Sequence, residues 1–155
     1  MERGLVVWSG ARCGKMDERK NTMRLRVRYS ETDRMGTFYN SRALEWFECG
    51  RGELLRDMHL PYARMEERGV MLPLVEAHVE YLGRAQYDDE LEITTSVAFS
   101  GKARLRFDMR IVHAANGAAV AQGYTVHAIT DPSGKPRRPP AWLVEKLQGL
   151  SNAPQ

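Results

Sequence analysis

Hydrophobic and polar residues alternate with a two-residue period in several parts of the chain, and this pattern is typical of half-buried strands. The first such segment covers residues 24–29. The same period recurs within residues 70–82, 90–100, 104–113 and 118–130, so we expect five strands. The later strands are joined mainly by short turns, and strands joined in this way pair antiparallel. The pattern therefore predicts an antiparallel sheet.

One long helix is expected directly after the first strand and its turn. Asn40 or Ser41 provides a good N-cap, and apolar residues then recur with helical spacing as far as Met58. Trp46 and Phe47 widen the apolar stripe, which favours a helix that is covered on more than one side. We therefore predict an α+β domain in which a curved antiparallel sheet wraps around one long central helix.

Smaller features complete this outline. Short helices are expected over residues 61–68 and 139–147. Gly50 and Gly52 interrupt the long helix, and each costs such a helix about 1 kcal/mol relative to Ala. The expected compensation is close approach of a neighbouring backbone.

Length and composition indicate a single globular domain. The chain has 155 residues, of which 43% are hydrophobic and 28% charged, and these proportions exclude a disordered tail or a membrane protein. Its apolar runs are far shorter than the roughly 20 residues of a membrane-spanning helix or the core of a signal peptide, so we expect a cytoplasmic protein. Residues 1–22 show no sustained period, which predicts a flexible N-terminal extension before a domain over residues 23–150.

Charge and cysteine usage narrow the possible ligands. The net charge is +3, but basic residues are interleaved with acidic ones, unlike the single basic face of a typical nucleic-acid binder. A small polyphosphate ligand suits this balance equally well. Cys13 and Cys49 form no metal-binding or disulfide pattern, and His78 and His127 fall in strand patterns as surface or strand-pairing residues. We expect no metal site and no nucleic-acid or membrane partner.

Two segments carry a family resemblance. Residues 29–40 contain an Asp-x-x-Gly element and an aromatic pair, and residues 45–48 continue into the long helix with Glu-Trp-Phe-Glu. This order resembles the opening of the 4-hydroxybenzoyl-CoA thioesterase family, whose members are hotdog-fold acyl-CoA thioesterases. The resemblance extends over about residues 23–148 and includes Tyr81–Arg84, Tyr87–Leu91 and Gly134–Pro136.

The resemblance implies a catalytic role for Asp33. A carboxylate can attack a thioester or act as the base for a water molecule, and backbone N–H groups at a helix start can stabilise the carbonyl oxygen as it becomes negative. Here these would be Asp33 and the N–H groups near Tyr39 and Asn40, with Tyr39 also shaping the acyl pocket. One branch of the family has His at the position of Asn40, so we expect no His-dependent role there. The alternatives are that Asp33 only caps a turn, and that Glu48 in the helix is the catalytic carboxylate.

Coenzyme A carries phosphate groups, which Arg and Lys side chains bind. The candidates for this contact are Arg84, Lys102, Arg104 and Lys135, with Arg137 and Arg138 close to the last. Family resemblance places the region of residues 102–104 near the nucleotide. It also implies a homodimer or homotetramer with sites at the subunit interface, and no cofactor.

The sequence thus predicts hydrolysis of an acyl-CoA to a free acid and coenzyme A. Two alternatives remain. The substrate could be borne by an acyl carrier protein, or the domain could bind acyl-CoA as a sensor without hydrolysing it, because a fold does not fix a function.

Overall fold

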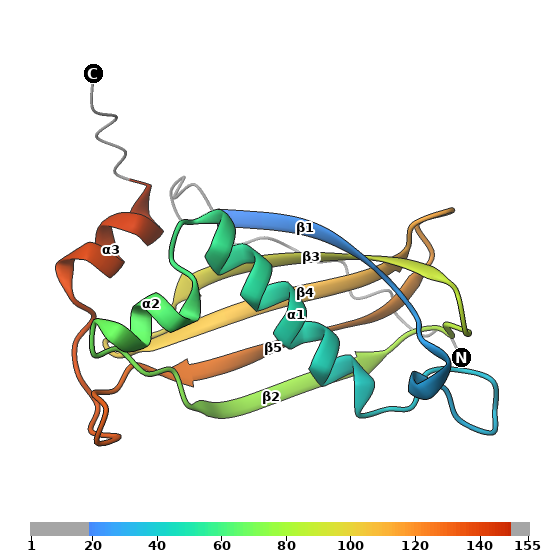
Figure 1. The fold of residues 1–155 in the computed structure, drawn as a ribbon, viewed down its shortest axis with the longest axis horizontal. Coiled ribbons are helices and arrows are strands. Elements are labelled where there is room, and N and C mark those ends of the chain that lie inside the picture. Colours follow the sequence, from blue (N-terminus) through green and yellow to red (C-terminus); the bar gives the residue numbers. More distant parts are fainter. Residues whose placement is uncertain (1–18, 150–155) are drawn as a thin grey trace, which may run out of the picture.

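A computed structural model describes residues 19–149 of the chain. Its strands form one antiparallel five-stranded sheet in the order β1-β3-β4-β5-β2 (Figure 1). The prediction of an antiparallel sheet is confirmed, and the two strands at its edges are β1 and β2. The strands are β1 (Arg19–Arg26), β2 (Leu74–Tyr81), β3 (Glu90–Phe99), β4 (Arg104–His113) and β5 (Ala119–Ala128).

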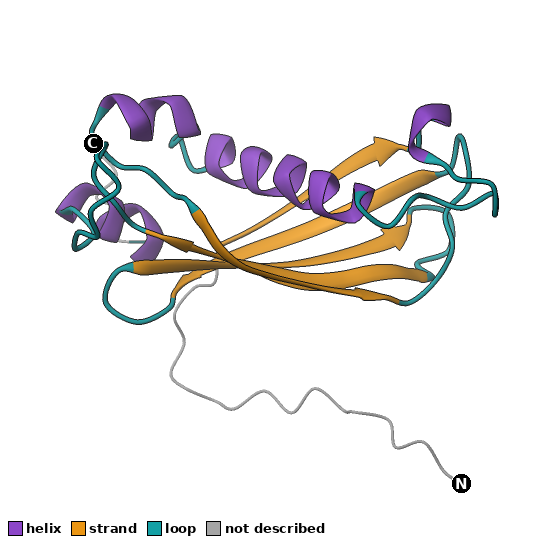
Figure 2. Cartoon of the chain, turned by 90° about the horizontal axis from the view of Figure 1, so that it is seen from below, coloured by secondary structure: helices purple, strands orange, loops and turns teal. Residues whose placement is uncertain are grey.

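The long helix α1 (Arg42–Asp57) lies across one face of this sheet (Figure 2). The predicted helix is confirmed, with Ser41 as the residue before its first turn. Three shorter helices are η1 (Tyr29–Glu31), α2 (Tyr62–Glu67) and α3 (Ala141–Gln148). The prediction of one central helix covered by a sheet is therefore confirmed for the described residues.

The first strand begins and ends earlier than expected. β1 begins at Arg19, and Tyr29 belongs to a turn of 3-10 helix that follows it. Residues 19–22 thus pair with β3, from Arg19 opposite Val97 onwards, and do not belong to an extension. They are polar on both faces, so periodicity gave no signal, and cross-strand pairing decided their structure. Residues 1–18 of the expected extension lie outside the described part.

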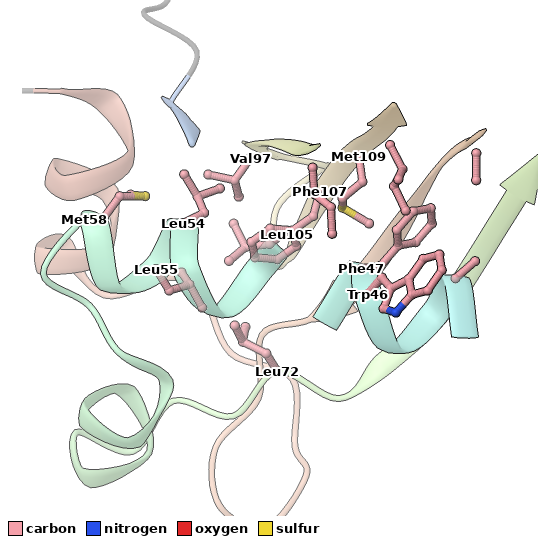
Figure 3. Close-up of a cluster of buried hydrophobic side chains, with 14 of the residues drawn as sticks. Trp46, Phe47, Leu54, Leu55, Met58, Leu72, Val97, Leu105, Phe107 and Met109 are labelled. Atoms are coloured by element: carbon pink, nitrogen blue, oxygen red, sulfur yellow. The ribbon is translucent and has the colours of Figure 1, made fainter. Parts of the chain in front are cut away.

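The core lies between α1 and the sheet face that it covers (Figure 3). Trp46 and Phe47 are both buried, as the wide apolar stripe predicted. On the sheet side, buried Leu105, Phe107, Met109 and Ile111 alternate with polar residues along β4.

Gly50 marks the point where the helix comes closest to the sheet. A Cβ atom added to Gly50 would lie 2.5 Å from the hydroxyl oxygen of Thr95 on β3. The expected close approach is confirmed there, although the neighbour is a side chain and not a backbone. A Cβ atom added to Gly52 would contact only the side chain of Arg56 in the same helix. The expectation that a neighbouring segment approaches closely was therefore wrong for Gly52.

The two ends of the sheet carry different loops. Arg26 pairs with Glu90 at one end, where the chain leaves β1 for the loop that leads into α1. Arg104 pairs with Ala128 at the opposite end, which also holds α2 and α3 (Figure 1). Strands of ten residues span roughly 30 Å, so side chains at the two ends of one subunit lie far apart.

Candidate functional site

Asp33 lies in a tight turn between the end of β1 and the start of α1. Its N–H donates to the carbonyl oxygen of Thr37 at 2.9 Å, and its own carbonyl accepts the N–H of Gly36 at 3.1 Å. Gly36 has a φ of 73°, the left-handed conformation that glycine adopts most easily. Oδ1 of Asp33 accepts the N–H of Met35 at 2.8 Å. Asp33 therefore does cap a turn, but its Oδ2 has no hydrogen bond within residues 19–149.

A buried carboxylate ties this turn to the helix. Glu31 is 4% exposed and accepts hydrogen bonds from the backbone N–H of Arg28 at 2.7 Å, the indole of Trp46 at 3.1 Å and the guanidinium of Arg28 at 3.2 Å. Burial pushes the pKa of Glu31 upward, but these hydrogen bonds and the charge of Arg28 outweigh it and lower the pKa overall. Glu31 is not among the site residues predicted from the sequence, because only the fold places Trp46 beside it.

The free backbone donors at the helix start lie one residue later than expected. The N–H of Tyr39 donates to the carbonyl of Glu31 at 2.8 Å, so it is not available to a substrate. In the described chain, the N–H groups of Asn40 and Ser41 have no acceptor. The hydroxyl of Tyr81 donates to the carbonyl of Asn40 at 2.6 Å and so helps to fix this peptide. The expected donors near Tyr39 and Asn40 stay a prediction, in which the N–H of Tyr39 is already used and those of Asn40 and Ser41 are free.

The segment after β2 holds the Asp33 turn from the other side. The guanidinium of Arg84 donates to the carbonyl of Met35. The next residue, Ala85, accepts the N–H of Phe38 at 2.8 Å. The ring of His113 at the end of β4 in turn contacts the carbonyl of Arg84 at 2.7 Å. Arg84 thus braces the turn that carries Asp33.

The remaining basic candidates lie elsewhere. Lys102 and Arg104 lie at the β3–β4 connection, and Lys135 in the turn that follows β5, all exposed. The carbonyl of Ala103 accepts the N–H of Ile129 at 2.8 Å, which holds these segments together at one end of the sheet. Asp33 and Arg84 lie at the other end. The four basic residues therefore do not form one cluster within a chain, because the strands between them run the full length of the sheet.

A cavity of about 680 Å³ follows α1 from Glu45 in its first turn to Arg56 in its last. The alternative carboxylate Glu48 is exposed and lines this cavity. Its walls also include Arg51 and His127, together with the apolar side chains of Met23, Leu55, Leu72 and Phe107. Glu48 and Asp33 thus occupy different elements, on the helix and in the turn before it.

His127 was expected to be a surface or strand-pairing residue; it pairs with Leu74 and Leu105 on the neighbouring strands and is buried, at 5% exposure, so only the surface alternative was wrong. Its Nδ1 lies 2.9 Å from the carbonyl of Leu72, and its Nε2 lies 3.0 Å from the hydroxyl of Thr125. Burial, assisted by the positive charge of Arg51, lowers the pKa of His127 although the bond to Leu72 raises it. The strand pattern gave the correct element, but only the position of α1 shows which face of β5 is covered.

No group of three His, Cys, Asp or Glu side chains between residues 19 and 149 is placed to hold a metal ion. No helix of the described part is long and apolar enough to cross a membrane. The turn before α1 carries a carboxylate oxygen without a hydrogen bond, and the start of α1 carries backbone N–H groups without an acceptor, within the described residues.

Comparison with known proteins places these features in a family. The Thioesterase-like superfamily matches residues 27–147. The chain belongs to this family. Acyl-CoA thioester hydrolase YbgC of Escherichia coli is 30% identical over 124 residues, which make up 80% of this chain and 92% of that protein. The 1,4-dihydroxy-2-naphthoyl-CoA hydrolase of Synechococcus elongatus is 30% identical over 79% of this chain and 88% of that protein. A shorter match, 37% identical to YneP of Bacillus subtilis, covers 46% of this chain and 51% of that protein.

Solved structures share the fold. Protein TT1821 from Thermus thermophilus is 30% identical with a TM-score of 0.77, covering 85% of this chain and 98% of that one. A 4-hydroxybenzoyl CoA thioesterase in complex with 4-hydroxybenzoyl CoA has a TM-score of 0.74 at 20% identity, covering 83% of this chain and 99% of that one, and shows the fold alone. The predicted hotdog fold and the family resemblance are confirmed. Membership also confirms the prediction of a thioester hydrolase.

The lowered pKa of His127 predicts a loss of stability in mild acid. Its folded pKa lies below the roughly 6.5 of an unfolded histidine, so the unfolded chain binds the proton first. The stability that neutral His127 provides is therefore complete above about pH 6.5 and declines as the pH falls below it. We expect the Tm of the wild type to fall between about pH 7.5 and 5.5, and that of His127→Gln to fall less.

The control is Thr22→Val, which changes an exposed side chain of β1 that does not titrate and should keep the pH dependence of the wild type. The lowered pKa of Glu31 does not interfere, because its contribution is lost only below the ordinary carboxyl pKa of about 4.5. Equal slopes of Tm against pH for the wild type and His127→Gln would contradict the prediction.

Proposed function

We propose that the protein hydrolyses an acyl-CoA thioester to a free acid and coenzyme A, with Asp33 as nucleophile or general base. The observation that supports this most is the free Oδ2 of Asp33 in a braced turn, immediately before a helix start with two unpaired N–H groups. The names of the relatives support the substrate class, since two of them are a CoA thioester hydrolase and a CoA hydrolase.

The proposed chemistry needs an attacking oxygen and stabilisation of the negative carbonyl oxygen. Asp33 either attacks the thioester carbon itself, forming an anhydride that water then hydrolyses, or takes a proton from an attacking water. In both cases the C–S bond breaks and coenzyme A leaves as the thiolate, which then takes up a proton. The N–H groups of Asn40 and Ser41 would donate to the carbonyl oxygen, strengthened by the dipole of α1.

We further propose that the protein works as a homodimer, or as a tetramer built from dimers. β2 lies at an edge of the sheet, and Leu74, Val75 and Tyr81 along it are 53%, 49% and 51% exposed. An exposed, apolar edge strand is prone to pair with another chain. Pairing β2 with its symmetry mate would extend the sheet across a two-fold axis.

Such pairing would also bring basic residues of one subunit close to Asp33 of the other. Because the paired β2 strands would run antiparallel, the end of the partner that carries Lys102, Arg104 and Lys135 would come beside the Asp33 end of the first subunit. A substrate could then contact Asp33 of one subunit and the basic residues of the other. The cytoplasmic location and the choice between dimer and tetramer stay predictions.

Asp33→Asn should lower kcat by at least about 100-fold, the scale of losing a positioned base or nucleophile. The swap is nearly isosteric, and an amide oxygen can still accept the N–H of Met35, so the fold should survive. The measurement is steady-state hydrolysis over a panel of short, long and aromatic acyl-CoAs, with Asp57→Asn as a control at the far end of α1. Turnover like the wild type in a folded Asp33→Asn protein would exclude Asp33 and favour Glu48.

Neutralising Lys102 and Arg104 together to Gln should raise KM with little change in kcat. Groups that hold the nucleotide do so equally in the ground state and the transition state, so they affect binding more than chemistry. The same change should leave hydrolysis of a truncated acyl-pantetheine unaffected, because that substrate has no nucleotide. An unchanged KM for acyl-CoA would contradict nucleotide binding here and favour a substrate borne by an acyl carrier protein.

Mixing two impaired variants tests whether the site is shared between subunits. A heterodimer of Asp33→Asn and the Lys102/Arg104 double variant would hold one intact site if the two sets act across the interface. Random pairing then predicts about a quarter of the wild-type activity at substrate concentrations well below KM. Co-expressed and purified mixtures give the measurement. No gain over the separate variants, or a fully active monomer in sedimentation, would contradict the shared site.

A further inference from the structure

Arg51 is a largely buried cation for which the structure provides no acidic partner. It projects from the middle of α1, and within the described residues its side chain forms one hydrogen bond, from Nη1 to the hydroxyl of Thr125 at 3.4 Å. Burial lowers the pKa of its guanidinium, with the nearby negative charge of Glu48 acting in the opposite direction. No carboxylate of residues 19–149 forms an ion pair with it. Buried arginines are normally paired, because burying an isolated charge is costly.

The polar residues beside Arg51 cannot satisfy it further. The carbonyl of Leu72 can only accept, so Nδ1 of His127 must be the protonated nitrogen, and Nε2 of the neutral ring is then an acceptor. The hydroxyl of Thr125 donates to that Nε2 and is left with lone pairs only. Thr125 can therefore accept one N–H of Arg51, while the guanidinium has five. Most of its donors remain without an acceptor in the described chain.

These donors border the cavity along α1. Two of the glutamates that line the cavity are already paired: Glu45 with Arg42 at 2.7 Å and Glu53 with Arg56 at 2.5 Å. Glu48 is exposed, so water screens its charge, whereas Arg51 is half-buried and shares the cavity wall with Leu55, Leu72 and Phe107. The cavity therefore has apolar walls and one partly desolvated cation without an ion-pair partner in the described chain.

The cavity also begins close to the proposed reaction centre. Its first lining residue on the helix is Glu45, one turn after the N–H donors of Asn40 and Ser41. Arg51 lies ten residues after Ser41, about 15 Å along the axis at 1.5 Å per residue. Helical side chains lean toward the helix N-terminus, so the long side chain of Arg51 shortens this gap. An acyl group that extends from the oxyanion donors along this cavity would direct its far end toward Arg51.

We propose that Arg51 binds a carboxylate at the far end of the acyl group, so that the preferred substrates are CoA monothioesters of dicarboxylic acids. This inference rests on the proposed acyl-CoA hydrolysis. The planar guanidinium matches a carboxylate with two parallel hydrogen bonds, and such an anion would supply the missing partner of Arg51. Arg51 is thus a specificity residue, and Thr125 and His127 orient it.

The test compares substrates that differ only in the terminal group. Glutaryl-CoA is measured against valeryl-CoA, and 4-carboxybenzoyl-CoA against 4-methylbenzoyl-CoA. The wild type should prefer the carboxylate of each pair by about tenfold or more in kcat/KM, since each charge-assisted pair in a partly buried site is worth at least that factor. Arg51→Met should lose the preference and keep its activity on the neutral member, and Arg51→Lys should keep part of the preference. Arg110→Met, which removes an exposed arginine from β4, is the matched control.

A binding measurement separates this inference from the proposed activity. Free glutarate should raise the Tm of the wild type more than valerate at equal concentration, and this difference should vanish in Arg51→Met. If acyl-CoAs are hydrolysed but the neutral substrates are preferred or equal, the inference fails and the proposed function stands. If glutarate binds through Arg51 but no acyl-CoA is hydrolysed, the proposed function fails and the carboxylate site stands. A stronger preference for a terminal hydroxyl than for a carboxylate would also overturn the inference.

Discussion

The candidate site depends on one buried carboxylate. Glu31 joins the end of the first strand, the Asp33 turn and the helix, because its side chain accepts from Arg28 and Trp46 while its carbonyl accepts from Tyr39. A buried carboxylate of this kind is held in its charged state by its donors, and removing one donor leaves a group that cannot be solvated. The turn is therefore positioned relative to α1 by a charged hydrogen-bond centre and not by apolar packing alone.

This constraint also decides which groups are free to react. The carbonyl of Glu31 accepts the N–H of Tyr39. The unpaired donors at the start of α1 are therefore the next two peptide N–H groups, those of Asn40 and Ser41. Helix starts always have unpaired N–H groups, and they attract negative charge when no side chain caps them. Ser41 forms no side-chain cap here. An uncapped helix whose preceding turn is already fixed therefore presents the donors that the proposed oxyanion site requires.

The polar residues under α1 follow a different rule from the rest of the core. Apolar side chains fill most of the space between the helix and the sheet. Thr125 and His127 instead form a chain of hydrogen bonds that ends at Arg51. Hydrogen bonds satisfy the two β5 residues fully and the arginine only in part. A half-buried cation of this kind at the wall of a cavity favours the proposed ligand more than it favours stability, since apolar replacements of buried charges are often at least as stable.

The sequence by itself determined the elements and their class. The two-residue period gave the strands β2 to β5, the helical stripe through Trp46 and Phe47 gave α1, and the Asp-x-x-Gly element singled out Asp33. These signals are local, because side-chain periodicity follows directly from backbone geometry. The start of β1 was not predicted, because its polar residues show no periodicity and are held by pairing with β3.

Only the tertiary structure decided which of the singled-out residues meet. Arg84 braces the Asp33 turn while Lys102 and Arg104 lie at the far end of the sheet, a separation set by strand length and direction that no local pattern contains. The burial of Glu31 and His127 likewise depends on what α1 covers. Charged and polar residues look alike along a sequence whether they face water or a helix. Their roles are therefore set by long-range packing, which brings donors, acceptors and apolar walls together from distant segments.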